Sequence, residues 1–154
     1  MNVVKSNEIP FATALERGKF SNKRKSLTTW ESKIQAGMWE LPAGKTSWPM
    51  HRHFVTEEAL YVVSGRAKVR TPDGDTVVGP GDYVSFLAGG PAHQLVNDFA
   101  EPFVYLALST NSAGADIVEY PHSGKIASSV GTGEKRTRYM FRAKDQVDYF
   151  DGEE

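Results

Sequence analysis

The residues best suited to chemistry are three histidines and two adjacent glutamates in the middle of the chain. Only four histidines occur in 154 residues, and His51, His53 and His93 share one region with Glu57 and Glu58. Imidazole and carboxylate groups are ligands for divalent transition metals. The chain has no cysteine. Any metal site must therefore use histidine, carboxylate or water, and disulfides, thiolate zinc sites, iron–sulfur clusters and thiol nucleophiles are excluded.

A single residue separates His51 from His53. On a β-strand, side chains two residues apart project from the same face, about 6 to 7 Å apart along the chain. Two such imidazoles can bind the same ion at about 2.0 to 2.2 Å each. Clustered imidazoles beside a carboxylate cost desolvation energy unless something binds them, so the cluster favours a metal site over a purely structural role.

Glycines at regular distances surround these residues. Six residues separate Gly44 from His51, four separate His53 from Glu58, and six separate Glu58 from Gly65. A second group follows further along the chain and consists of Gly81, Gly89, His93 and Asn97.

The two groups together resemble the two sequence motifs of the cupin superfamily, G-x5-H-x-H-x3or4-E-x6-G and G-x5-P-x-G-x2-H-x3-N. The first motif differs here by one extra residue before His51. In the second, Leu87 stands at the usual proline and one residue is inserted before His93. These departures loosen the loop before His93 but leave every ligand type in place.

The resemblance covers roughly residues 27–109 and implies an all-β fold, the double-stranded β-helix or jelly roll of the cupin barrel. Most metal-binding cupins hold one divalent ion inside the barrel. Carried over to this sequence, the implied metal ligands are His51, His53, Glu58 and His93. Glu57 competes with Glu58, and we prefer Glu58 because it alone gives the gaps of four and six residues.

Four nitrogen and oxygen ligands leave open positions on a five- or six-coordinate ion. Such positions let a metal polarise a substrate carbonyl or activate water or dioxygen. We expect one divalent ion per chain, and the donor types suit Mn, Fe, Ni, Zn, Co or Cu, so the identity of the ion stays open.

Short strands are the elements that would position these residues. From Leu27 to Leu108, runs of Val, Tyr, Phe, Thr and Trp alternate with Gly, Pro, Asp and Asn at intervals typical of a β-sandwich or barrel. The predicted strands lie near residues 27–34, 37–41, 50–54, 58–63, 66–71, 75–78, 83–87, 93–97, 102–109, 116–120 and 135–141.

Strand alternation predicts what else lines the pocket. Leu60 and Val62 share the face of Glu58, and Leu95 shares the face of His93, which makes these three the candidate substrate-binding residues. The lining would then be largely apolar. A highly charged substrate would find few fixed partners, whereas a small carbonyl compound or hydroxy acid bound mainly to the metal would fit.

The flanking segments are predicted to be extensions of the barrel, which spans residues 27–120. Residues 1–26 form an N-terminal arm, with a short helix near Ala12–Arg17 or a segment laid on the domain. Residues 121–154 contain a small-residue loop at 123–133, an extra strand and an acidic tail. The loop is either a lid or a simple connection.

The C-terminal segment resembles a subgroup of single-domain cupins labelled sugar-phosphate isomerase-like. The similarity lies in Asp116–Lys125, Arg138–Arg142 and Val147–Gly152. An acid commonly follows Tyr-Pro in that subgroup, and here His122 occupies the position. We interpret His122 as a surface loop residue rather than a fifth ligand.

The amino-acid composition limits the classes of partner that the protein can bind. A formal charge of -1 gives no basic field for nucleic acid or anionic lipid, and no apolar run approaches the ~20 residues that span a bilayer. The sequence therefore indicates a soluble cytoplasmic protein with a small-molecule ligand. The family resemblance also implies a homodimer.

Two functions stay open. The first is a metal-dependent enzyme acting on a small carbonyl-, hydroxy-acid- or sugar-type molecule, with isomerase, lyase and dioxygenase chemistry unresolved. The alternative is a non-enzymatic cupin that binds or senses a small molecule.

Overall fold

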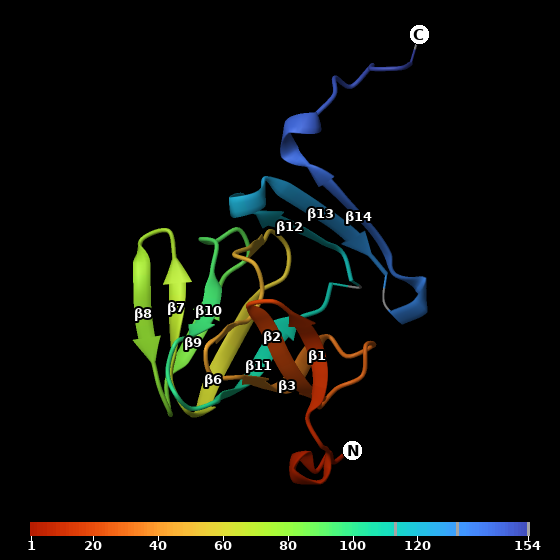
Figure 1. Ribbon diagram of the computed structural model, residues 1–154. Helices are drawn as coiled ribbons and strands as arrows, with labels where there is room; N and C mark the ends of the chain where they lie inside the picture. Colours follow the sequence, from red (N-terminus) through yellow and green to blue (C-terminus); the bar gives the residue numbers. More distant parts are fainter. Residues whose placement is uncertain (113, 132, 154) are drawn as a thin grey trace.

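The computed structural model describes residues 1–112, 114–131 and 133–153, and its regular structure is almost entirely β (Figure 1). Within these residues, four short 3₁₀ segments occur, at Ser6–Glu8, Pro121–Ser123, Gly133–Lys135 and Ala143–Asp145. The strands are β1 (Ala12–Arg17), β2 (Phe20–Ser26), β3 (Ile34–Leu41), β4 (Lys45–Thr46), β5 (Arg52–His53), β6 (Glu58–Ser64), β7 (Ala67–Thr71), β8 (Gly74–Val78), β9 (Tyr83–Phe86), β10 (Gln94–Asn97), β11 (Phe103–Thr110), β12 (Asp116–Tyr120), β13 (Lys125–Val130) and β14 (Thr137–Arg142). In the described part of the chain, no helix has the length and apolar character needed to cross a membrane.

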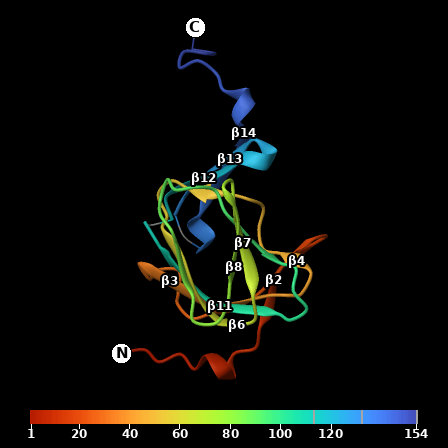
Figure 2. The same cartoon turned by 90° about the vertical axis from the view of Figure 1, so that its left-hand side faces the viewer.

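The larger sheet has ten strands and is strongly curled. Its strand order is β8-β7-β10-β4-β2-β3-β11-β6-β9, with β1 added on β2. Figures 1 and 2 show the strands wrapping around a common interior. Nearly all strand neighbours are antiparallel, and most are distant in sequence, as expected for a jelly roll. The predicted all-β double-stranded β-helix is confirmed.

A second, four-stranded sheet lies across one end of the curled sheet, and its order is β14-β13-β12-β5. Its link to the barrel is the pairing of β12 with β5, in which Val118 lies opposite His53 and Glu119 lies opposite Arg52. This pairing brings the C-terminal part of the chain directly against β5, which ends in His53 and begins just after His51.

The apolar core lies on the inner face of the curled sheet. On β11, Tyr105 lies opposite Trp39 of β3 and Val62 of β6, so these three side chains share one face. Phe103 is fully buried in the same cluster, and its ring stacks on Tyr105 with 5.1 Å between centroids. Burial of this alternating apolar face is the main source of stability for the curled sheet.

The turn after β6 explains one glycine of the motif. Gly65 has a φ of 72°, and a Cβ there would lie 2.1 Å from the carbonyl oxygen of Pro102. Any side chain at this position would force two neighbouring segments of the barrel apart. Only glycine allows both the left-handed backbone and the close approach.

Near the N-terminus, the helical alternative for Ala12–Arg17 and the predicted strand at 27–34 are wrong. Ala12–Arg17 forms strand β1 rather than a helix, because it pairs with β2 as a hairpin. Residues 27–34 form a loop up to Ile34 rather than a strand. There, the side-chain amide of Gln35 donates hydrogen bonds to the carbonyls of Thr29 and Ser32, and these bonds hold the loop in place of a β-ladder.

The predicted loop at 123–133 is also wrong over most of its length, because Lys125–Val130 forms strand β13 between β12 and β14. Small residues suit this strand because two of them, Ala127 and Ser129, are buried. Thr132 lies outside the described residues. The other predicted strands agree with the observed ones to within three residues.

Candidate metal centre

Three separate elements bring the predicted ligands together. His51 lies just before β5 and forms an antiparallel bridge with His93, just before β10. Their backbones exchange two hydrogen bonds, of 3.1 Å from His51 N and 2.8 Å from His93 N. Glu58 is the first residue of β6, and His53 ends β5.

The donor atoms converge on one carboxylate oxygen. Oε2 of Glu58 lies 3.4 Å from Nε2 of both His53 and His93, and 3.9 Å from Nε2 of His51. Ligand atoms of His51, Glu58 and His93 all lie within 4.8 Å of one another. Two ligands on one ion are at most about 4.3 Å apart, so a small closure would let this group hold a metal.

Glu57, the competing carboxylate, lies elsewhere. Its side chain is exposed, and its backbone N–H donates a 2.9 Å hydrogen bond to Oγ1 of Thr110. His122 is likewise exposed, in the 3₁₀ segment after β12.

Hydrogen bonds on the far side of two imidazoles fix which ring nitrogen faces Glu58. Nδ1 of His51 donates to the carbonyl of Pro49 at 2.8 Å, and Nδ1 of His53 donates to Oδ2 of Asp116. Each bond keeps the proton on Nδ1 and leaves the Nε2 lone pair for a ligand role. The sequence analysis missed Asp116, since 63 residues separate it from His53.

His93 is held differently. Its ring stacks on Phe86, with centroids 3.7 Å apart and planes inclined by 10°. Within the described residues, its Nδ1 is buried and has no hydrogen-bond partner. Packing against the aromatic ring therefore sets the orientation of this imidazole.

Burial and neighbouring charges shift the pKa values of His51, His53 and Glu58. Burial lowers the pKa of His51 to about 4, although the charge of Glu58 opposes the shift. Burial also favours the neutral form of Glu58, but the hydrogen bond with His93 and the nearby histidine charges outweigh it and lower the pKa of that carboxyl. For His53, burial is outweighed by the Asp116 hydrogen bond and the charge of Glu58, which raise its pKa. The lowered pKa values of His51 and Glu58 favour the neutral imidazole and the ionised carboxylate that a divalent metal needs, whereas the raised pKa of His53 favours its protonated form, so a metal bound there would displace a proton.

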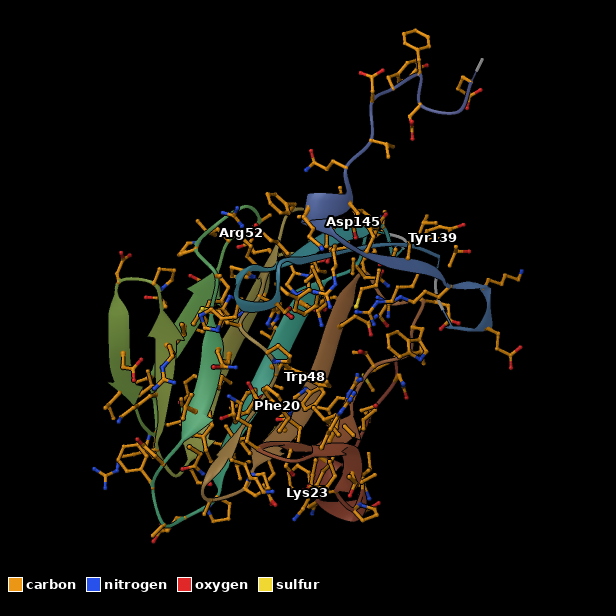
Figure 3. All side chains as sticks on the ribbon, turned by 45° about the horizontal axis from the view of Figure 1, so that its top comes forward. Phe20, Lys23, Trp48, Arg52, Tyr139 and Asp145 are labelled. Atoms are coloured by element: carbon orange, nitrogen blue, oxygen red, sulfur yellow. The ribbon has the colours of Figure 1, made fainter. Side chains whose placement is uncertain are left out.

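The group opens into a cavity of about 480 Å³, which suits a small organic molecule. Leu60 and Leu95 line it, as does Trp48, labelled in Figure 3, whose ring is edge-on to Trp39 at 6.1 Å. Val62 is buried in the apolar core and is not part of the described wall.

The expectation of a largely apolar lining is incomplete. Four basic side chains also line the cavity, namely Arg24, Lys125, Arg136 and Arg138. They come from β2 and from the C-terminal sheet and its 3₁₀ connection. The sequence analysis predicts an arm, a loop and an extra strand for these segments, and nothing in those patterns places their side chains at the site.

Comparison with known proteins gives the class. The model of the cupin domain family matches residues 37–109, so this segment of the chain is a cupin domain. The chain resembles the subgroup labelled sugar-phosphate isomerase-like. No curated protein sequence matches it.

Solved structures with the same fold fall into several groups. A protein from Acidithiobacillus ferrooxidans, named as a candidate sugar phosphate isomerase, is 26% identical with a TM-score of 0.73, and the match covers 83% of this chain and 80% of that one. A cupin from Silicibacter pomeroyi, named a sugar phosphate isomerase, is 19% identical with a TM-score of 0.78 over 97% of this chain and 98% of that one. A protein from Thermotoga maritima, named a predicted oxalate decarboxylase, is 21% identical with a TM-score of 0.62 over 71% of this chain and 98% of that one. The last two show the fold alone.

Proposed function

We propose that this chain is a metal-dependent cupin enzyme that acts on a small carbonyl-, hydroxy-acid- or sugar-type molecule. The proposed ligands of one divalent ion are His51, His53, Glu58 and His93. One observation carries the proposal: three imidazole Nε2 atoms face a single Glu58 oxygen, at 3.4 to 3.9 Å, at the wall of an open cavity. A homodimer and a cytoplasmic location stay predictions from the sequence.

A bound divalent ion would act as a Lewis acid toward an oxygen of the substrate. The chain's own residues prepare the site for that role. Asp116 and the carbonyl of Pro49 hold protons on Nδ1 of His53 and His51, so both rings present Nε2 to the cavity. Leu60, Leu95 and Trp48 provide apolar wall that excludes water from a bound molecule.

Isomerisation also needs a group that moves a proton, and Glu58 is unsuited while it serves as a ligand. Tyr120 is the candidate in the cavity wall. Its ring stacks on His51 with 6.1 Å between centroids, and its hydroxyl accepts a 3.1 Å hydrogen bond from Nη2 of Arg138. Because the hydroxyl oxygen is engaged as an acceptor, its own proton is left to donate to a bound molecule. The name of the 26% identical relative agrees with isomerase chemistry.

Metal content is the first test. Metal-free protein is reconstituted anaerobically with Mn, Fe, Ni or Zn and analysed by inductively coupled plasma mass spectrometry. We expect about one equivalent per chain in the wild type, and its loss in His51→Ala and His93→Ala. His122→Ala is the matched control, because His122 is exposed and outside the cavity. A wild type that binds no metal under any condition would overturn the proposal.

Turnover separates the enzyme from the binding module. The loaded protein is incubated in D₂O with small sugars, sugar phosphates and hydroxy acids, and proton exchange or product formation is followed by NMR. Turnover that disappears in His51→Ala supports the enzyme. Tight binding of a compound without any turnover would favour the non-enzymatic alternative.

A further inference from the structure

The cavity wall has basic side chains whose charges are not neutralised by carboxylates. The two carboxylates that line the cavity already have partners: Glu58 contacts the imidazoles and Asp116 contacts His53. In the described part of the chain, none of the four basic side chains of the wall forms an ion pair with a carboxylate. By contrast, Arg52 in β5 lies 2.5 Å from Oε2 of Glu119 and is neutralised.

Arg24 is the most confined of these cations. It lies on β2 opposite Trp39 of β3, and its guanidinium carbon is 5.2 Å from the Trp39 ring and 5.8 Å from the Trp30 ring. Its Nε is buried and has no hydrogen-bond partner among the described residues. Burial lowers the pKa of Arg24, as it does for a cation that lacks a carboxylate partner. A buried, unpartnered donor carries a desolvation cost that an anionic ligand would offset.

Gly37 makes room for this arrangement. A Cβ at Gly37 would lie 3.2 Å from Nε of Arg24 and 3.2 Å from Nε1 of Trp39. Even the Cβ of alanine would require one of these neighbouring groups to shift by a few tenths of an ångström. The rings of Trp30 and Trp39 and the absence of a side chain at Gly37 therefore leave a space in the cavity wall that Arg24 occupies.

The C-terminal sheet and its 3₁₀ connection add three cations, and within the described residues their side chains contact neutral groups. Arg138 donates to the hydroxyl of Tyr120, and Nη2 of Arg136 donates to Oγ of Ser129 at 3.3 Å. Nζ of Lys125 lies 5.4 Å from the centre of the Tyr120 ring. None of these contacts cancels a positive charge, so the cavity keeps an excess of basic groups.

We propose that the molecule bound at this site carries an anionic oxygen group, a phosphate or a carboxylate, held by Arg24 together with Arg138. This inference rests on the proposed function and specifies its substrate class. A guanidinium offers paired N–H donors that match either group, and the nearby Trp30 and Trp39 rings limit the positions open to that of Arg24. An anion held by these arginines, together with an oxygen held at the His/Glu group, would orient the reactive part of the molecule.

Three probes with one carbon skeleton test the proposal: glycerol, glycerol 3-phosphate and glycerate. Their affinities are measured by isothermal titration calorimetry on metal-loaded wild type, Arg24→Ala and Arg24→Lys. We expect Arg24→Ala to weaken binding of the preferred anion by roughly tenfold to hundredfold, as for loss of a charge-assisted hydrogen bond. Arg24→Lys keeps the positive charge but not the paired N–H donors of the guanidinium, so it should reduce the affinity for the anion by less than Arg24→Ala does. Tighter binding of glycerol 3-phosphate than of glycerate identifies phosphate, and the reverse order identifies carboxylate.

Arg66→Ala is the matched control. Arg66 also lies over an aromatic ring, 4.8 Å from the centre of Phe99, but it does not line the cavity. Its removal should leave all affinities unchanged. Arg138→Ala, compared with Arg142→Ala on the same strand but outside the described wall, gives a second test if Arg24→Ala does not fold.

Metal content of the same samples separates this inference from the proposed function. Wild type that holds metal but binds neither anion, or variants at Arg24 and Arg138 that bind the anions as tightly as wild type, would overturn the inference alone. Wild type without metal would overturn the proposed function, whatever the calorimetry shows. Retained metal with weakened anion binding in Arg24→Ala supports both.

Discussion

Asp116 joins the C-terminal sheet to the histidine pair, and its replacement by asparagine perturbs the proposed metal site without touching a ligand. Oδ2 of Asp116 accepts from Nδ1 of His53. Oδ1 accepts from the backbone N–H groups of Val55 and Thr56, at 3.2 and 3.3 Å. Burial opposes ionisation of Asp116, but the hydrogen bonds from His53 and Thr56 prevail and lower its pKa. The carboxylate is thus an acceptor on both sides.

Asparagine can accept on only one side. If its oxygen keeps the two backbone donors, its NH₂ group faces Nδ1 of His53. The imidazole must then move its proton to Nε2, which removes the lone pair that faces Glu58. Loss of such a carboxylate partner typically costs about tenfold to hundredfold in metal affinity, and we expect that reduction for Asp116→Asn.

Competition with a chromogenic chelator at neutral pH measures this change. Asp98→Asn is the matched control, because that carboxylate is exposed and pairs with Lys68 at 2.6 Å, outside the cavity. Thermal unfolding followed by circular dichroism verifies that each variant is folded. Equal metal affinity in Asp116→Asn and wild type would refute the reasoning about the His53 tautomer.

Three further predictions follow from burial and charge. Glu58→Gln should abolish metal binding and Glu57→Gln should leave it unchanged, as measured by mass spectrometry; equal losses would contradict the assignment of Glu58. Phe103→Ala removes a fully buried ring from the core and should lower the free energy of unfolding by about 3–5 kcal/mol in urea titrations, and a change below about 1 kcal/mol would show that the core is less tightly packed. The hydrogen bonds and charge of Arg70 lower the pKa of Asp75 below 3.8, so the stability from this pair is present above that value and is lost as the pH falls through the lowered pKa. Asp75→Asn should therefore lower the midpoint of thermal unfolding slightly at neutral pH, and the difference from wild type should shrink as the pH falls below 3.8; a difference that does not change with pH would contradict the pairing.

The barrel and the three histidines could be predicted because their signals are local. The alternation of side chains along extended backbone places His51 and His53 on one face, and this does not depend on pairings with distant segments. The glycine spacing then links them to Glu58 and His93, and the structure does bring these side chains around one oxygen. Local patterns of this kind survive folding because each strand carries its own register.

The other side chains around the cavity could not be predicted, since they depend on pairings between distant segments. Asp116 reaches His53 only because β12 adds to β5, and Arg24 reaches the wall only because β2 lies between β3 and β4 in the curled sheet. The composition of these strands does not indicate which strand each of them pairs with. A basic residue on a short polar strand reads as solvent-exposed until its neighbour across the sheet is known.

The arrangement assigns different tasks to the two sheets. The curled sheet and its adjoining loops provide His51, Glu58 and His93, whereas the four-stranded sheet provides His53 on β5, Asp116 behind it, Tyr120 over His51, and Arg138 bonded to Tyr120. A displacement of this sheet would therefore alter metal affinity and anion binding together, although it contributes no proposed ligand beyond His53 of β5. Substitutions that weaken the pairing of β12 with β13, at a distance from the cavity, should reduce both affinities in parallel, whereas Arg24→Ala should reduce only one.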